Sequence, residues 1–156
     1  MKHEAAEEFA LAVRALALSM IQYRNAALRS VTKIGPTDGA ALGRLHDEGP
    51  LTPTQLASKL NLTTGSMTTL LDRLQGVGYV TRHPHPTDRR RIVVELTDAA
   101  RRLIVEDLLR PLIDVLAPVC QHLDSERQQQ VISSVIDAEA ALQQAASQLA
   151  ESTRGT

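Results

Sequence analysis

The chain has 156 residues, of which 43% are hydrophobic and only 2% aromatic, and its formal net charge is −1 at pH 7. This length is enough for one hydrophobic core, which aliphatic side chains must supply. The single cysteine, Cys120, excludes an intramolecular disulfide, the acidic N-terminus is no signal peptide, and no apolar run approaches the roughly 20 residues that cross a bilayer. We therefore expect a single domain, residues 1–156, located in the cytoplasm and not in a membrane.

The small net charge hides an uneven distribution. Between Leu51 and Arg102 the sequence has eight basic and four acidic residues, whereas the rest has nine basic and fourteen acidic residues. A basic segment within an acidic chain is typical of a region that binds nucleic acid, because the phosphates attract Lys and Arg.

The N-terminal part predicts two helices. The first covers about residues 4–29, and its apolar residues occupy more than one face, so it needs more than one neighbour. A second subunit can supply that neighbour, while burial within the monomer is the alternative. After the break at Ile34-Gly35-Pro36, we expect Thr37 or Asp38 to cap a second helix that ends near His46.

A short helix is predicted to start at Thr52. This residue is a hydroxyl N-cap, Pro53 suits the first helical position, and Gln55 completes a capping box. Asn61-Leu62 predicts a tight turn, after which Thr63 can cap another helix.

This next helix is two-sided. Met67, Leu70, Leu71 and Leu74 form one apolar stripe. The opposite side is small and rich in hydroxyls near its start: Gly65, Ser66, Thr68, Thr69, Asp72 and Arg73. Short side chains let a helix enter a groove deeply, hydroxyls can hydrogen-bond base edges, and a helix N-terminus favours phosphate. An ordinary solvated helix surface is the alternative.

A β-hairpin is predicted to follow. Residues 79–82 predict one strand, residues 83–88 a turn, and residues 91–96 the return strand, with Ile92, Val94 and Leu96 facing inward. At or beside the tip lie three adjacent cations, for which a polyanion is a natural partner: Arg89, Arg90 and Arg91. The fold class is thus mainly α with a small β-hairpin, a winged helix-turn-helix.

Within this segment the sequence resembles the multiple-antibiotic-resistance regulator (MarR) family. The motifs that carry the resemblance are LT-x-x-Q-LA at residues 51–57, LDRL at residues 71–74, Gly78-Tyr79-Val80, and Asp88-Arg89-Arg90-Arg91 followed by Leu96-Thr97. The resemblance implies a homodimeric transcription regulator of palindromic double-stranded DNA. Its recognition helices would enter successive major grooves, and a wing arginine would enter the adjacent minor groove.

The resemblance also implies individual DNA contacts. They fall on Thr64, Gly65, Ser66, Thr68, Thr69, Arg73, Arg89 and Arg90. Arg90 corresponds to the minor-groove arginine of the family, and Asp88 to the acid that orients it. Arg73 lies beside Asp72, so a structural ion pair is an equal alternative to a phosphate contact. The chain departs from the family at Thr69, where a larger polar residue is common.

The C-terminal part predicts two further helices. Thr97 can cap the first, which should run to about Leu116, with Pro111 bending or breaking it and Pro118 beyond its end. Ser125, with Gln128 in a capping box, is expected to start the last helix. We expect residues 37–102 to form the DNA-binding region, and the flanking helices, residues 1–33 and 103–156, to form the dimerisation region.

The sequence gives little support for metal binding, cysteine oxidation or enzyme catalysis. We expect no cofactor and no metal, because His83 and His85 lack companions at ligand spacing. We expect Cys120 to be a packed thiol, a peroxide sensor being the alternative. The sequence has no nucleophile elbow, phosphate loop, HExxH or dinucleotide fingerprint, so an enzyme is not expected.

The function expected from the resemblance is that of a repressor released by a small apolar or phenolic ligand. This effector would bind between the dimer helices and the DNA-binding region, and change the spacing of the recognition helices. Two alternatives stay open: a winged-helix module for protein association without DNA readout, and a constitutive DNA-binding regulator without an effector.

Overall fold

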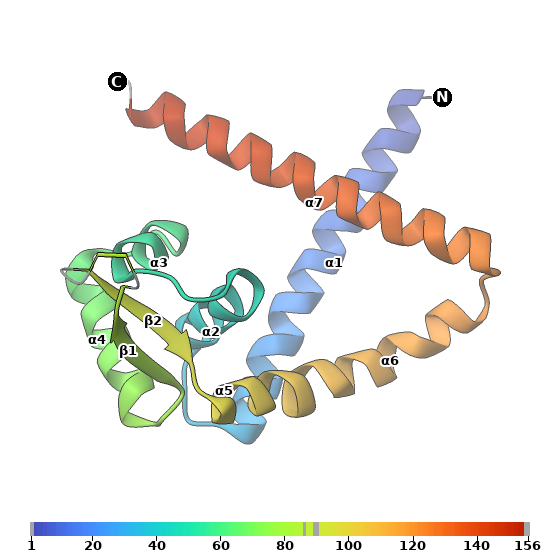
Figure 1. Ribbon diagram of the computed structural model, residues 1–156. Coiled ribbons are helices and arrows are strands. Elements are labelled where there is room, and N and C mark those ends of the chain that lie inside the picture. The colour runs from blue at the N-terminus through green and yellow to red at the C-terminus, as the bar shows by residue number, and fades with distance from the viewer. Residues whose placement is uncertain (1, 86, 89–90, 155–156) are drawn as a thin grey trace. The chain divides into compact units, whose positions relative to one another are not determined.

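The computed structural model describes residues 2–85, 87–88 and 91–154 (Figure 1). The elements follow one another as α1 (Lys2–Val31), α2 (Pro36–Glu48), α3 (Pro53–Lys59), α4 (Thr64–Gly76), β1 (Val80–Pro84), β2 (Ile92–Leu96), α5 (Asp98–Arg102), the π-helix η1 (Leu103–Leu109), α6 (Arg110–Gln121) and α7 (Ser125–Arg154). The chain is therefore mainly helical with one hairpin, which confirms the predicted fold class.

The chain divides into two compact units. One unit contains Leu16–Leu112, and the other contains the part of α1 up to Ala15 together with the residues from Ile113 onward. The first unit holds the second half of α1, the helix-turn-helix, the hairpin, α5 and η1. Every residue of the hydrophobic core belongs to this unit.

The core of this unit is aliphatic, as the composition requires. The predicted stripe of α4 is buried, and its first and last members, Met67 and Leu74, are fully enclosed. They pack in one cluster with side chains from α1, α2, α3, the hairpin, α5 and η1, including Leu28, Leu42, Leu45, Leu56, Val80, Val94, Ala100 and Ile104. Burial of one stripe of α4 leaves its opposite side for other contacts.

The two helices of the helix-turn-helix begin where the sequence predicts. The Gln55 backbone N–H donates to Thr52 Oγ1 (3.3 Å), and the Thr52 N–H donates to Gln55 Oε1 (2.9 Å), which completes the capping box. Thr63 Oγ1 accepts from the Ser66 N–H (3.2 Å). Between the helices, Asn61 has a φ of 52°, a left-handed conformation that asparagine tolerates in turns.

The predicted start of α2 is wrong. Its N-cap is Gly35, with Pro36 at the first helical position, so neither Thr37 nor Asp38 is the cap. Asp38 is instead the third helical residue, and its Oδ2 accepts from the Gly35 N–H at 2.9 Å. The helix continues past His46 to Glu48 and ends at Gly49, whose φ of 79° suits glycine.

The hairpin pairs β1 and β2 antiparallel, from Val80 opposite Leu96 to Pro84 opposite Ile92. His83 and Pro84 thus belong to β1 and not to the turn, because a two-stranded ribbon has a free edge on which proline needs no ladder partner. Val94 and Leu96 are buried as predicted, whereas Ile92 is 50% exposed because it lies at the outer end of the hairpin.

The helices after the hairpin differ from the prediction near their prolines. Thr97 caps α5 as expected, by accepting from the Ala100 N–H (3.2 Å). Ahead of Pro111 the backbone widens into η1, where the Arg110 N–H donates to the carbonyl of Val105, five residues back. This wider turn relieves the crowding that a proline causes in an α-helix. Pro118 lies inside α6, so the predicted end of this helix near Leu116 is wrong.

Two predictions at the start of α7 are also wrong. The cap is Asp124, whose Oδ1 accepts from the Arg127 N–H at 2.9 Å, and not Ser125. The Gln128 amide donates to the carbonyls of Cys120 (2.9 Å) and Leu123 (3.0 Å), so it closes the preceding turn and forms no capping box.

The prediction for the single cysteine is wrong as well. Cys120 is an exposed free thiol and not a packed one.

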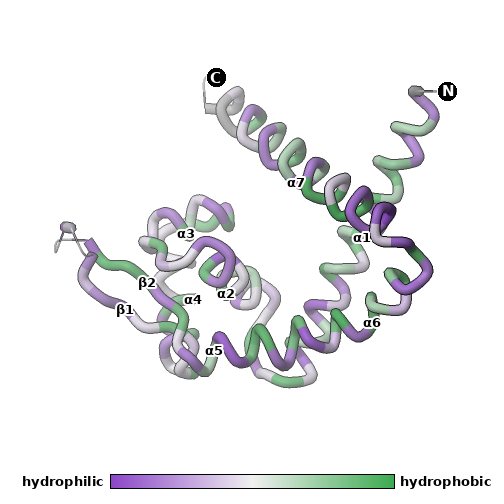
Figure 2. Tube along the Cα trace, turned by 45° about the vertical axis from the view of Figure 1, so that its right-hand side comes forward, coloured by the Kyte–Doolittle hydropathy of each residue, from purple (hydrophilic) through white to green (hydrophobic). Residues whose placement is uncertain are grey.

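Helices α6 and α7 carry exposed apolar side chains at helical spacing. Figure 2 shows apolar residues, in green, recurring along both helices. The large side chains that are more than half exposed are Ile113, Val115, Val119, Val131, Ile132, Val135, Ile136, Leu142 and Leu149. Among the described residues, no helix combines the length and apolarity that a membrane span requires. These side chains therefore form apolar surface on amphipathic helices.

Candidate nucleic-acid interface

The outward side of α4 is the centre of the candidate site. Thr64, Gly65, Ser66, Thr68 and Thr69 are all exposed, on the side of the helix opposite its buried stripe. This arrangement follows from the sequence, because apolar residues at spacings of three and four turn one side inward and leave the small residues outside.

Two hydroxyl groups on this surface are hydrogen-bond donors toward the helix and acceptors toward the outside. Thr68 Oγ1 donates to the Thr64 carbonyl (3.0 Å), and Thr69 Oγ1 donates to the Gly65 carbonyl (3.2 Å). With their protons used inside the helix, both oxygens present lone pairs outward. In a major groove, such acceptors match the amino groups of adenine and cytosine.

Gly65 has no structural reason within this chain to be a glycine. A β-carbon built at this position meets no atom within 4 Å, and the residue lies in the first turn of a helix. Alanine would therefore fit and would favour the helix. The absence of a side chain suits a surface that another molecule approaches closely.

Arg73 has an ion-pair partner that the sequence did not suggest. Its Nε donates to Asp38 Oδ2 (3.0 Å) and its Nη2 to Asp38 Oδ1 (2.6 Å). The hydrogen bonds and the negative charge of Asp38 raise the pKa of Arg73. Asp72, its neighbour in the sequence, pairs with Arg82 of β1 instead (2.6 Å). The structural ion pair is thus present, though with Asp38 and not with Asp72.

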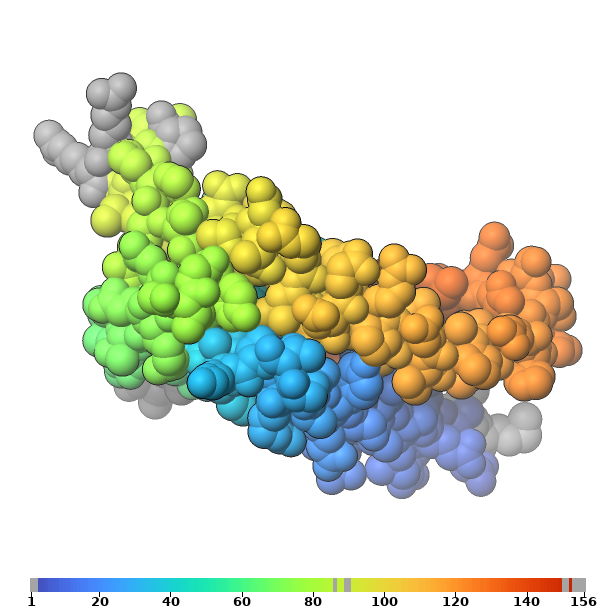
Figure 3. All heavy atoms as spheres, turned by 90° about the horizontal axis from the view of Figure 1, so that it is seen from below, coloured from blue at the N-terminus to red at the C-terminus, as the bar shows by residue number. Residues whose placement is uncertain are grey.

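The hairpin tip is described only in part. Arg89 and Arg90 lie outside the described residues, so their roles and the orienting role of Asp88 stay predictions. Asp88 is exposed, and its carbonyl accepts from the Arg91 N–H at 2.9 Å. Figure 3 shows the atoms of α4 and of the hairpin, in green and yellow-green, side by side at one end of their unit.

The histidines of the hairpin bond to threonines. His83 Nε2 lies 2.8 Å from Thr81 Oγ1, and His85 Nδ1 lies 3.2 Å from Thr87 Oγ1. Over the described part of the chain, no group of three or more His, Cys, Asp or Glu side chains could hold a metal ion. The arginines of this hairpin that the structure describes are Arg82, which pairs with Asp72 of α4, and Arg91.

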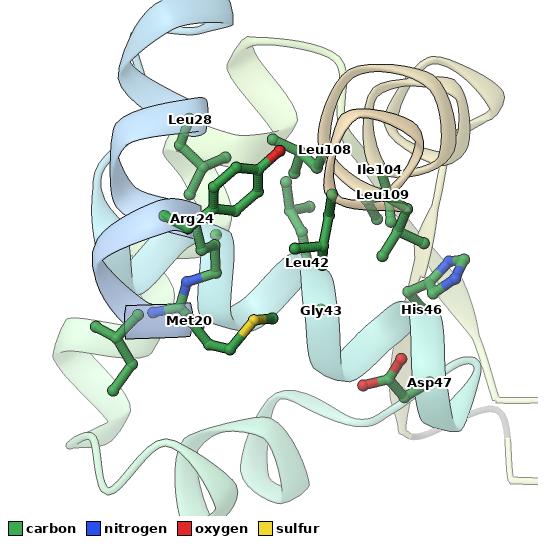
Figure 4. Close-up of a pocket in the computed structure, with 14 residues that line it drawn as sticks. Met20, Arg24, Leu28, Leu42, Gly43, His46, Asp47, Ile104, Leu108 and Leu109 are labelled. Carbon is green, nitrogen blue, oxygen red and sulfur yellow. The ribbon is translucent and has the colours of Figure 1, made fainter. Parts of the chain in front are cut away.

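A second feature of the same unit is a cavity of about 430 Å³ between α1, α2 and the η1 segment (Figure 4). Its lining is mainly apolar and includes Met20, Leu28, Leu42, Ile104, Leu108 and Leu109, with Arg24, His46 and Asp47 as charged or polar members. The Nε atom of Arg24 is buried and has no hydrogen-bond partner among the described residues. A buried guanidinium donor without a partner is costly, so the cavity favours an acceptor beside Arg24.

Comparison with known proteins identifies the fold and the class of this protein. A model of the MarR family matches residues 34–92, from just before α2 to the start of β2. The uncharacterized HTH-type transcriptional regulator YcgE of Bacillus subtilis is 39% identical over 100 residues, which are 64% of this chain and 64% of that protein. The uncharacterized HTH-type transcriptional regulator ML2140 of Mycobacterium leprae is 34% identical over 115 residues, 69% of this chain and 77% of that protein. The chain belongs to the MarR family.

Solved MarR-family structures share the fold. A MarR family protein from Bacillus stearothermophilus matches with a TM-score of 0.74 and 22% identity over 92% of this chain and 99% of that chain. A mutant of Staphylococcus aureus MepR, bound to an oligodeoxyribonucleotide, matches with a TM-score of 0.57 and 23% identity over 86% of this chain and 97% of that chain. MarR-family proteins are DNA-binding transcription regulators and not enzymes, and this chain has their winged helix-turn-helix.

Two features of this MarR-family chain escaped the sequence analysis. Asp38 lies 35 residues from Arg73, and no periodic pattern connects them. Arg24 did have a signal in the sequence: it interrupts a row of apolar residues four apart, between Met20 and Leu28. A charged residue within such a row is turned toward the interior, and it therefore needs a partner or a ligand.

Proposed function

We propose that this chain is a homodimeric, sequence-specific repressor in the cytoplasm, released from palindromic double-stranded DNA by a small ligand. The observation that carries the proposal is the exposed face of α4, where small residues and outward acceptors lie beside a basic hairpin. In this proposal α4 enters the major groove, and Thr64, Gly65, Ser66, Thr68 and Thr69 contact the DNA. Arg89 and Arg90, with Asp88 as the orienting acid, approach the minor groove.

Dimerisation would set the spacing between the two recognition helices on the DNA. The exposed apolar residues of α6 and α7 support pairing of two chains, because apolar surface of this extent is stabilised by a partner. Two recognition helices related by a twofold axis would contact half-sites about 10 base pairs apart. The dimer therefore explains why the DNA should be palindromic.

The DNA-binding proposal is tested with a duplex that the wild-type chain selects from a randomised library. Its affinity should fall steeply between about 50 and 200 mM salt, because phosphate contacts release counterions. We expect Arg90→Ala to weaken binding by about tenfold and to lower the salt slope by about one. Arg127→Ala, which removes an exposed cation of α7, is the matched control and should change neither quantity.

If no duplex is selected, or if affinity does not respond to salt, the proposal of DNA readout is wrong. A winged-helix module for protein association would give that result.

The cavity supports release by a small acidic ligand with an apolar body. Its volume of about 430 Å³ suits a small molecule. The orphaned Nε of Arg24 would bind a phenolate or carboxylate, while the aliphatic lining would hold the ring or chain. In Figure 4, Arg24 and Met20 from α1 face the same space as Leu42 and His46 from α2.

Ligand binding is tested by thermal unfolding in the presence of benzoate, salicylate or phenol. A ligand at about 100 times its dissociation constant stabilises the folded state by about 2.7 kcal/mol. We expect at least one acid to raise the melting temperature of the wild type and to lower its DNA affinity. Arg24→Met should lose the shift, whereas Arg29→Met, an exposed position on the same helix, should keep it. Equal shifts in the two variants would contradict a role for Arg24, and DNA binding without any ligand response would indicate a constitutive regulator.

A further inference from the structure

One buried carboxylate ties α4 to the start of α2. Asp38 is 1% exposed, and three donors converge on it: the Gly35 N–H, Arg73 Nε and Arg73 Nη2, at 2.9, 3.0 and 2.6 Å. Both carboxylate oxygens are used, and the carboxylate lies in the first turn of α2, where a negative charge is favourable. The pair is therefore a fixed, fully hydrogen-bonded fork.

The ion pair between Arg73 and Asp38 joins α4 to α2, whereas the apolar packing of α4 is mainly with other elements. The recognition helix packs mainly on α3 and β1. The Arg73 side chain extends from the third turn of α4 to α2, and its fork fixes direction as well as distance. A helix held at its packed stripe can still roll about its axis, and a bidentate contact from its flank opposes that rotation.

We infer that Arg73 is a positioning residue, which acts on DNA affinity through Asp38 by setting the angle at which the hydroxyl face of α4 meets the groove. The inference rests on the proposed DNA-binding function and replaces the direct phosphate contact expected for Arg73. The Arg73 side chain is 48% exposed, yet its Nε edge faces the carboxylate and not the solvent.

The positioning role and the direct phosphate contact of Arg73 predict opposite changes in specific DNA affinity when Asp38 is substituted. Asp38 is enclosed and cannot touch DNA, and its removal leaves one negative charge fewer near a polyanion. By electrostatics alone, Asp38→Asn should strengthen binding or leave it unchanged. If the pair positions α4, the same substitution should weaken specific binding, although the chain becomes more positive.

The experiment measures specific and non-specific affinity, with their salt slopes, for the wild-type dimer and five variants. The specific probe is the duplex selected by the wild type, and the non-specific probe is a scrambled duplex of the same length. We expect Asp38→Asn and Arg73→Gln each to lower specific affinity about tenfold or more, to leave the salt slope unchanged and to affect non-specific affinity much less. The double variant should bind no worse than the weaker single variant, because both remove the same contact.

Arg73→Lys provides a test that does not depend on how Asp38→Asn folds. Lysine keeps the charge but cannot form the fork, so the positioning role predicts a loss of specific affinity similar to that of Arg73→Gln. A phosphate contact predicts that lysine substitutes well and that Arg73→Gln lowers the salt slope by about one. The control is Glu48→Gln, which breaks the exposed pair between α2 and Lys59 of α3 and should leave both affinities unchanged.

The results separate the inference from the proposed function. Selection of no duplex by the wild type would refute DNA readout itself. Selection of a duplex, followed by wild-type affinity in Asp38→Asn or in Arg73→Lys, would overturn the positioning role alone. Thermal unfolding of each variant accompanies the measurements, since a partly unfolded population lowers specific and non-specific affinity by the same factor.

Discussion

At the scale of single residues, the exposed side of α4 lacks a side chain at one position and lacks outward hydroxyl protons at two others. Gly65 adds no atoms where alanine would fit, and Thr68 and Thr69 direct their protons back into the helix. Such choices do not stabilise the isolated chain, because glycine and threonine are weaker helix formers than alanine. Residues that lower helix stability and pack against nothing are best explained by an external contact.

Gly65→Ala tests this explanation directly. We expect the variant to raise the free energy of unfolding by up to about 1 kcal/mol, because alanine favours the helix and meets no neighbour. The same methyl group should weaken binding to the selected duplex by about tenfold, because it separates the helix from the groove. Chemical denaturation and DNA titration measure the two effects.

Gly76→Ala is the control for this prediction, since its β-carbon also meets nothing within 4 Å but lies at the far end of α4. Wild-type DNA affinity in Gly65→Ala would remove this residue from the interface.

At the scale of elements, the local chemistry of helix starts decided where the helix-turn-helix lies. The hydroxyl caps at Thr52, Thr63 and Thr97 were predictable because a capping side chain acts within three residues of itself. At α2 the prediction failed, because the helix starts at Pro36, closer to the N-terminus than predicted. Its cap is Gly35, which has no side-chain oxygen. The π-helix before Pro111 was also missed, since its wider turn has no periodic signature in the sequence.

Thr52→Ala should destabilise the protein by about 0.5–2 kcal/mol, because it removes the acceptor for the Gln55 N–H and the donor to Gln55 Oε1. The residue is buried, so the orphaned groups gain little from water. Urea unfolding of the wild type and the variant measures the difference. Thr54→Ala, an exposed position in the same helix, is the control, and a loss of similar size there would show that capping is not the cause.

At the scale of the whole molecule, the sequence identified the fold through an ordered set of local motifs. It could not identify Asp38 as the partner of Arg73, because contacts across 35 residues depend on how helices pack and not on neighbouring residues. The resemblance implied an effector site between the dimer helices and the DNA-binding region, but the residues that line the cavity escaped prediction for the same reason, as they come from three separated segments. The contacts that were missed at this scale arise only after the chain has folded.

The proposed dimer can be tested at the exposed stripe of α7. Val135 is 51% exposed, and Val135→Glu should introduce a charge into the subunit contact. We expect this variant to sediment as a monomer and to lose most of its affinity for the palindromic duplex, while the unit formed by Leu16–Leu112 stays folded. Ser133→Glu, a polar position of the same helix, should leave the dimer intact. A dimeric Val135→Glu protein would exclude this stripe from the interface.

The carboxylate of Asp38 also constrains how this sequence can diverge. An acid enclosed at position 38 is tolerable only with a cation opposite it, and the guanidinium at position 73 approaches closely because that acid is present. Relatives that lose one of the two groups should therefore have lost the other, with an apolar or amide pair in their place. The two positions should covary in descent although 35 residues separate them.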